Sequence, residues 1–420
     1  MATALAAGRR GCAPALAWVL AWTIQGAGAE ALGPLLARVL DRDPQVRVAQ
    51  SLLEAGDARV RQLRSRFWPA LALNANIGQS SDLDFGLPVD RRIERSELAL
   101  RWNLYNAGND RAELDALTIE SDAARAEVAR AREEAATRIA EAYLDLLRTD
   151  ALLPPAIARV EAVQRLVGLA QRQTTEGKSS EADLQQALAS QVDGEVALEQ
   201  LRADQAGARQ RLARLAGEDV FGLQPVTLLA AAGDAAARPA GLRAAELRAA
   251  ASRVRVRPVE SLAAPKINLD LRQRLSDNTR PQASTVQRSG WGVQLNWELP
   301  LGGELGARID EAASRAAAAA AEVERLDQER LAERSALVPR IAAAERGVAL
   351  LAAPVAQWSA LIRAGELQFE AGRRSLQQLI ALREGLYTAQ QRLAEQANQL
   401  VRLQLRLALL DGRLLAALGL

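Results

Sequence analysis

The stretches WNLYNAG (102–108) and WELPLGG (297–303) decide the fold, because they are two copies of one motif. Their tryptophans, Trp102 and Trp297, are separated by 195 residues (297 minus 102), and so are their last glycines. Repeats in solenoid proteins have periods of roughly 20–50 residues. The much longer period here indicates that one domain-sized unit has been duplicated.

The register of the two copies is kept along the whole chain. Two further pairs lie at the same spacing and one is offset by a single residue: Pro44 with Pro239, Gly177 with Gly372, and Pro69 with Pro265. Each copy predicts the order helix, β-hairpin, long helix, turn, helix. We therefore predict a first repeat over 30–235 and a second over 236–420, after a leader at 1–29.

The element bounds follow from the periodicity of each repeat. In the first repeat we expect a hairpin at 70–105, a long helix at 107–173, a tip at 174–183 and a return helix to 215. In the second we expect a hairpin at 266–301, a long helix at 304–368, a tip at 369–378 and a return helix to 416. Helices at 37–66 and 240–262 would precede the two hairpins. The class is α+β and mainly α.

The composition excludes several kinds of chemistry. The chain has no histidine, one cysteine and one methionine, which largely excludes zinc, haem, thiol and His-based acid–base sites. Only 3% of its residues are aromatic and 25% are charged, and alanine is abundant, which favours long helices packed at close range. No phosphate-binding loop, catalytic triad or metal-ligand spacing is present. We therefore expect no enzyme activity, no cofactor and no metal.

The N-terminus resembles a secretory signal peptide. Arg9 and Arg10 precede an apolar stretch from Cys12 to Ile24, and the small residues Ala27 and Ala29 predict cleavage before Glu30. An uncleaved anchor is the alternative. Cleavage would remove two of the 53 basic residues and none of the 51 acidic ones, which leaves a neutral chain without cysteine. A neutral chain argues against nucleic acid as a partner.

Four short segments alternate between apolar and polar residues. They are 70–79, 96–105, 267–272 and 291–299, with a tryptophan near the ends of the second and fourth. About ten alternating residues suffice for a tilted strand of an outer-membrane barrel, although an ordinary half-buried sheet has the same pattern. We expect polar loops at 80–94 and 276–289. Four strands cannot close a barrel, and open edges are not tolerated in lipid, so several chains would share one barrel.

The two long helices are far longer than globular proteins usually need. Each would span about 65 residues, or about 100 Å at 1.5 Å per residue. Pro154, Pro155, Pro339 and Pro354 should kink or break them. The glycines at the two tips, Gly177 and Gly372, are expected to cap the long helices.

Together these features resemble the TolC family of outer-membrane channels. The resemblance rests on the leader, the duplicated order of elements, WNLYNAG, WELPLGG, AYLDLL (142–147) and the two glycine tips, and it covers about residues 30–420. It implies a homotrimer in which four strands per chain form a twelve-stranded β-barrel in outer-membrane lipid. The long coiled-coil helices would continue it as a periplasmic α-barrel, and the chain would be localised in the outer membrane of a Gram-negative bacterium.

The resemblance also implies a gate at the periplasmic tips, held shut by tyrosine, arginine and aspartate contacts between helix pairs. Counted from the tip glycines, the arginine falls on Arg374, its aspartate partner on Asp183 and the aromatic residue on Phe369, which lacks a hydroxyl. For Arg374 and Asp183, solvated surface charges are the alternative.

The aspartates that ring the constriction in the family fall on Gln378 and Ala381. The acidic, cation-selective ring is therefore absent from these positions, so the gate should be weaker or differently selective.

The function implied by the resemblance is that of a passive exit duct. It would dock to an inner-membrane transporter, ABC-type or proton-driven, through a periplasmic adaptor protein. The segment from 372 to the C-terminus looks slightly more like the branch of type I protein secretion than that of drug efflux. A periplasmic coiled-coil adaptor or structural protein is the alternative from another class, although an adaptor would not place a short strand pair between helices twice.

Overall fold

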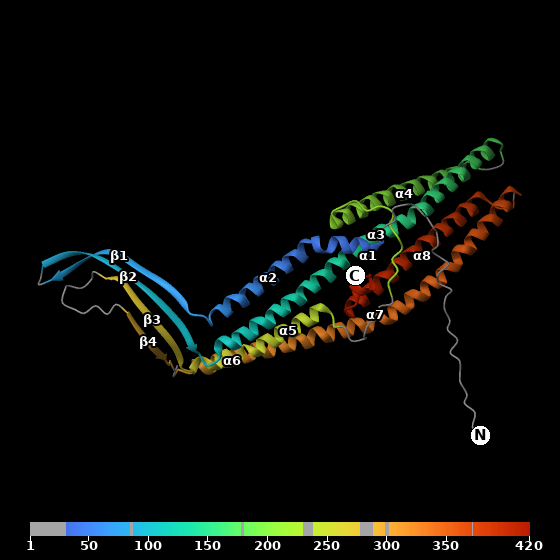
Figure 1. Ribbon diagram of the computed structural model, residues 1–420. Helices are drawn as coiled ribbons and strands as arrows, with labels where there is room; N and C mark the ends of the chain where they lie inside the picture. The colour runs from blue at the N-terminus through green and yellow to red at the C-terminus, as the bar shows by residue number, and fades with distance from the viewer. Residues whose placement is uncertain are drawn as a thin grey trace, which may run out of the picture.

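The computed structural model describes residues 31–84, 87–177, 180–229, 238–277, 289–298, 302–371 and 373–420. Over these residues the molecule is elongated, with a four-stranded sheet at one end and the tips of two helical hairpins at the other (Figure 1). The predicted leader lies outside the described residues.

The two long helices have the same bounds in both repeats. Helix α3 (Asn109–Thr175) and helix α7 (Glu304–Glu370) each contain 67 residues, and their first residues are 195 apart, as are their last. Each follows a glycine in the left-handed region, Gly108 with φ 78° and Gly303 with φ 77°, where a side chain would be strained. The predicted duplication is therefore visible in the backbone.

The return helices are also repeated. Helix α4 (Glu181–Ala216) follows α3, and helix α8 (Leu376–Leu410) follows α7. The second return helix was expected to reach residue 416, but it ends earlier. Gly412, with φ 65°, separates α8 from the short helix α9 (Leu414–Ala417).

The prolines do not break the long helices. Pro154 and Pro155 lie inside α3, and Pro339 and Pro354 lie inside α7, and both helices are continuous across them. The prediction of a break is therefore wrong. Each proline costs about one backbone hydrogen bond, and packing of the neighbouring turns is seen around Pro155. Around Pro155, Leu152, Ala156 and Val160 of α3 are buried with residues of α4.

The helices before the hairpins differ from the single helices expected at 37–66 and 240–262. The first is divided into α1 (Leu32–Val39), a 3-10 turn η1 (Leu40–Arg42) and α2 (Pro44–Ser65). The division arises because Pro44 begins α2, and Asp43 caps it by accepting hydrogen bonds from the backbone N–H groups of Gln45 and Val46. The second is divided into α5 (Ala240–Val254), α6 (Val256–Glu260) and a 3-10 turn η2 (Ser261–Ala263).

The sheet is antiparallel, with strand order β1-β2-β3-β4. Its strands are β1 (Ala70–Asp84), β2 (Leu87–Tyr105), β3 (Lys266–Asp277) and β4 (Ser289–Asn296). The expected loop at 80–94 is wrong, because β1 and β2 stay paired from Ala70↔Arg101 to Asp84↔Leu87. In both strands the alternation of apolar and polar residues ends before the backbone pairing ends. Hydrogen bonds between paired backbones do not require an apolar face, so the pairing continues through polar residues. The other expected loop, 276–289, lies almost wholly outside the described residues.

The main apolar core lies at the waist of the molecule. It joins α1, the middle of α3 and the ends of α4 and α8 to α9, with Leu35, Leu36, Tyr143, Leu212 and Leu414 among its fully buried side chains. The first and last helices meet here. A Cβ added to Gly33 would lie 2.5 Å from the backbone oxygen of Leu418, so the two backbones approach as closely as glycine allows.

Candidate functional site: two hairpin tips and a four-stranded sheet

The first hairpin tip is built by a glycine and a capping box. Gly177 adopts φ 71° after the end of α3, as expected of a helix-capping glycine. Ser180 then caps α4: its hydroxyl accepts a hydrogen bond from the N–H of Asp183 at 3.2 Å, and it donates to the Asp183 carboxylate at 2.8 Å. Asp183 therefore stabilises the start of its own helix.

The second tip repeats this design with an amide in place of the acid. Ser375 caps α8 and accepts a hydrogen bond from the N–H of Gln378 at 3.3 Å, and the Gln378 side chain accepts in return from the N–H of Ser375 at 3.4 Å. Gln378 is thus the counterpart of Asp183, at a spacing of 195. The predicted tip glycine, Gly372, lies outside the described residues.

Arg374 lies against its own hairpin. Its Nη1 atom is 2.7 Å from the place where a Cβ on Gly365 of α7 would be, so the absence of a side chain at Gly365 makes room for the guanidinium. Arg374 and Asp183 are each half-buried. The pairing of Arg374 with Asp183 stays a prediction, in which Asp183 would serve two partners.

Phe369 belongs to an apolar contact between the two hairpins, which we call the tip cluster. The buried members come from α3, α4 and α8: Val163, Leu166, Val167, Ala170, Ala187, Leu376, Leu379 and Ile380. Phe369 is half-buried and packs against them from the end of α7. The tip cluster holds α8 against the first hairpin.

A polar contact between the hairpins was missed by sequence reasoning. Arg159 of α3 donates to the carboxylate of Glu384 of α8 at 2.7 Å, and its guanidinium lies 4.9 Å from the ring centre of Tyr387. We call these three residues the inter-hairpin contact. Gln377 also donates to Gln186 of α4 nearer the tips. The only sequence signal was a lone tyrosine in α8, which does not reveal which helix faces it.

The pKa of Glu195 in α4 is lowered by hydrogen bonds from Gln191 and from Gln164 of α3. Among the described residues, no group of histidine, cysteine or carboxylate side chains is arranged to hold a metal ion.

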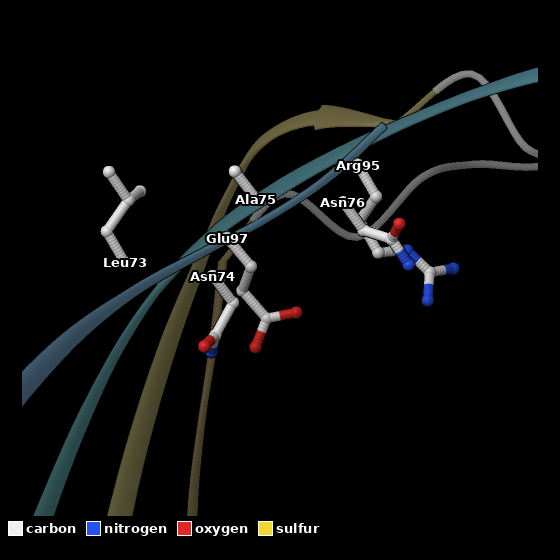
Figure 2. Close-up of a pocket in the computed structure, with 6 residues that line it drawn as sticks. All are labelled: Leu73, Asn74, Ala75, Asn76, Arg95 and Glu97. Atoms are coloured by element: carbon white, nitrogen blue, oxygen red, sulfur yellow. The ribbon is translucent and has the colours of Figure 1, made fainter. Parts of the chain in front are cut away.

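The sheet has one apolar and one polar face. Leu73 of β1 is 63% exposed and Leu295 of β4 is also 63% exposed, on the same face. On the polar face, Asn74, Asn76, Arg95 and Glu97 line a shallow hollow of about 310 Å³, and Figure 2 shows their side chains directed away from Leu73. An ordinary soluble sheet would cover its apolar face with helices. Figure 1 shows the sheet extending beyond the helices instead.

The two motif tryptophans join the sheet to the helices. The indole N–H of Trp102 donates to the backbone oxygen of Phe67 at 3.0 Å, just after α2. The indole N–H of Trp297 donates to the backbone oxygen of Ala263 at 2.9 Å, at the end of η2. The repeated tryptophan thus makes the same bond in both repeats, at the boundary between helix and sheet, where interfacial tryptophans are enriched in membrane proteins.

Comparisons with solved structures identify this architecture. The chain is similar to the outer membrane protein VceC from Vibrio cholerae (TM-score 0.79, 21% identity), covering 91% of this chain and 96% of that one. It is also similar to the CmeC outer membrane channel of Campylobacter jejuni (TM-score 0.80, 12% identity), covering 91% and 86%. At these identities the similarity shows the fold.

Sequence comparison supplies a relative and the family. The chain is 27% identical to Protein CyaE of Bordetella pertussis (strain Tohama I) over 224 residues, which is 52% of this chain and 45% of that protein. The match thus spans less than half of the relative. Residues 35–218 and 231–413 match the family described as outer membrane efflux protein. The chain therefore belongs to this family of TolC-type channels, which lie in the outer membrane and reach into the periplasm.

Proposed function

We propose that the protein is the outer-membrane exit duct of an export system and works as a homotrimer. The observation that carries this proposal is the four-stranded sheet, which has an exposed apolar face and two open edges. Within the described residues β1 pairs only with β2, and β4 pairs only with β3. In lipid such edges must be paired, and three chains joined through β1 and β4 would make a closed barrel of twelve strands.

The helices support the same assembly. By length and composition α7 contains the one described segment apolar enough to cross a membrane, yet only 6% of that segment is buried within the chain. Leu350 of α7 is 73% exposed, and Val196 of α4 is 65% exposed. Exposed apolar surface of this extent marks an interaction site. Because the α4 and α7 surfaces differ, a head-to-tail ring would bury one against the other.

The energy for export would come from partners. The sequence has no nucleotide-binding motif, so we propose that a periplasmic adaptor connects the hairpin tips to an inner-membrane transporter, ABC-type or proton-driven. The tip cluster and the inter-hairpin contact hold the two hairpins of each chain together. We propose that opening of the duct separates α8 from α3 at these contacts.

For the cargo we propose an unfolded protein exported by type I secretion. The C-terminal sequence GRRSLQQLIALREGLYTAQQRL (372–393) resembles that branch of the family. Export of small toxic compounds is the second candidate, and the description of the matching family as efflux proteins favours it.

The barrel is tested by charge on each face of β4. Leu295→Arg should prevent assembly, because an arginine at mid-membrane on the outer face costs about 2–4 kcal/mol in each chain. Asn296→Arg places the same charge on the polar face and should assemble. The measurement is the amount of SDS-resistant trimer in isolated outer membranes. Equal behaviour of the two variants would contradict the assigned faces.

The cargo is tested by deleting the gene in its own bacterium. Protein secretion predicts that one or more proteins disappear from the medium while sensitivity to small toxic compounds stays unchanged. Efflux predicts the opposite pattern. Complementation with the wild type, and failure of complementation with Leu295→Arg, would assign the effect to the assembled duct.

A further inference from the structure

The polar face of the sheet carries more basic than acidic side chains. From Arg95 to the helix-proximal end of the sheet, the register places five cationic residues on this face: Arg95, Arg101, Lys266, Arg272 and Arg274. The acidic residues on the same part of this face number three: Glu97, Asp270 and Asp277, the last opposite Arg95 in the register. The five and the three leave an excess of two positive charges in this part of each chain. Farther from the helices the register adds Arg91, Asp82 and Asp84, so over the whole described face six cationic residues stand against five acidic ones.

The charges are concentrated on the two central strands. The charges of this helix-proximal part all belong to β2 or β3, whereas the polar-face positions of β1 from Ala70 to Gly78 and those of β4 are uncharged, including Asn74, Asn76, Gln294 and Asn296. Neighbouring chains would pair with β1 and β4. The exposure of the central charges therefore does not depend on how those edges are covered.

In each of two ion pairs on this face, the carboxylate side chain is less exposed than the arginine side chain. Arg101 donates to Asp270 at 3.1 Å, and its side chain is 72% exposed while that of Asp270 is 14% exposed. Arg272 lies 3.9 Å from Glu97, and the two side chains are 61% and 23% exposed. The surface presented by this face is thus formed mainly by guanidinium groups, and the carboxylates hold those groups in place.

We propose that these arginines form an anion-binding ring inside the barrel, selective for multivalent anions that carry carboxylate or phosphate groups. The inference rests on the proposed trimer, in which the polar face lines the lumen and each chain contributes the same charges. Guanidinium groups bind both kinds of anion in a bidentate manner. Charges of one sign inside a wall of low dielectric constant concentrate counter-ions strongly.

The tips do not oppose this selectivity at the two positions where the family resemblance implies an acidic ring. Gln378 and Ala381 are uncharged. An anion that enters from the hairpin end therefore meets no acid at these two positions.

The experiment uses the full-length trimer in planar lipid bilayers. At low salt the wild type should pass chloride in preference to potassium, and inorganic pyrophosphate added to either compartment in turn should block the current from at least one side. The double variant R101Q/R272Q should need severalfold more pyrophosphate for the same block and should lose its preference for chloride. R101K/R272K keeps the charge and should keep the preference for chloride, but it should need more pyrophosphate than the wild type for the same block, because an ammonium group cannot bind in a bidentate manner.

Two controls separate an altered ring from an altered pore. At about 1 M salt the Debye length is about 3 Å, so all variants should have the same conductance if the barrel is intact. Arg38→Gln removes one positive charge per chain at the waist, where Arg38 pairs with Glu218 at 2.8 Å, and should leave pyrophosphate block unchanged.

The outcomes distinguish this inference from the proposed function. Channels that prefer potassium, or that are blocked by a multivalent cation and not by pyrophosphate, would overturn the anion ring while leaving the duct intact. Block that is equal in R101Q/R272Q and the wild type would also overturn it. Purified protein that forms no channels would instead contradict the proposed duct.

Discussion

The helical hairpins of the two repeats have the same backbone, but the long helix of the first is buried within the chain and that of the second is exposed. Helices α3 and α7 are both 67 residues long, yet 22 residues of α3 are buried and only five of α7 are. Tyr143 of α3 is fully buried, whereas Val338, its counterpart 195 residues later, is 48% exposed. Helix α3 packs against α2, α4, α5 and α8, so it is the central helix of the chain. Helix α7 lies at the periphery.

The difference teaches how one duplicated unit can serve two purposes. The first copy supplies the interior of the chain, and its side chains must satisfy neighbours within the same molecule. The second copy keeps an exposed surface that a neighbouring chain would cover. Equivalent substitutions in the two repeats should therefore act on different processes, monomer folding in the first and assembly in the second.

The largest difference is expected at Tyr143 and Val338. Tyr143→Ala should lower the free energy of unfolding by about 3–5 kcal/mol, because it empties a fully buried site. It also removes hydrogen bonds between the hydroxyl and Gln224, at 2.7 Å to the oxygen and 2.8 Å to the N–H. Val338→Ala should leave the stability of the detergent-solubilised monomer within about 0.5 kcal/mol of the wild type. Denaturant titrations measure both, and equal losses would contradict the comparison.

The next effect concerns the inter-hairpin contact, which exists only because the repeats differ. Arg159 corresponds to Pro354, and Tyr387 corresponds to Val192, so the second pair cannot form the same contact. Arg159→Gln should shift a closed–open equilibrium by about 1.5–3 kcal/mol, the usual value of a hydrogen bond to a charged group. Higher single-channel conductance with unchanged trimer yield is the expected result.

The predicted pair of Arg374 with Asp183 provides the competing test for the gate. If Arg374→Ala opens the channel and Arg159→Gln does not, the gate lies at the tips rather than at the inter-hairpin contact. Asp183→Asn keeps a side chain able to cap α4, which makes it the suitable partner variant.

A pH effect near neutral pH is expected from Glu133 of the first repeat. Burial raises the pKa of Glu133 to about 7, although a hydrogen bond from the N–H of Ala240 lowers it and nearby Glu134 raises it further. The folded chain thus binds this proton more tightly than the unfolded chain. The stabilisation is complete below the ordinary pKa of about 4.5 and is lost as the pH rises through about 7.

Glu133→Gln removes this dependence and copies the second repeat, where the equivalent residue is the exposed Gln328. Wild-type stability should fall by about 1–3 kcal/mol between pH 5 and pH 8, since one pKa unit corresponds to about 1.4 kcal/mol. The variant should show a flatter profile of unfolding midpoint against pH. A profile as steep as that of the wild type would assign the effect to another group.

The smallest effects are expected at the helix caps, where the repeats are alike. Ser180→Ala and Ser375→Ala should each cost about 0.5–2 kcal/mol, because each removes the hydroxyl that caps a return helix. Hydrogen exchange of the first turns of α4 and α8 measures the loss. Markedly different costs would indicate that Asp183 and Gln378 are not equivalent.

Much of this architecture could be predicted from the sequence. The predicted bounds of both long helices agree with the observed ones to within two residues. The glycines that precede these helices can be found in the sequence because helix capping depends only on neighbouring residues. The alternation of β1 and β4 assigns their faces, since a strand has a period of two. The predicted gate residues were assigned by counting residues from the tip glycines. Such counting gives the position of Arg374 on its helix but does not reveal which partner its long side chain reaches.

The errors have physical causes that single segments do not reveal. Loop 80–94 was predicted because its polarity does not alternate, yet backbone pairing continues through it. The prolines of α3 and α7 are accommodated in continuous helices. The inter-hairpin contact of Arg159, Glu384 and Tyr387 joins residues more than 200 positions apart, so only the packing of α3 on α8 brings it together.

The close approach of Gly33 to Leu418 has a consequence for how the protein is made. The waist core needs both α1 and α9, and α9 begins 375 residues after α1 ends (414 minus 39). A chain delivered N-terminus first cannot complete that core until α9 arrives. Until then Leu35, Leu36 and Tyr143 remain without part of their cover, so the growing chain depends on being kept from aggregation. Loss of residues 411–420 would therefore leave the waist core incomplete, because Leu414 and Leu418 belong to it.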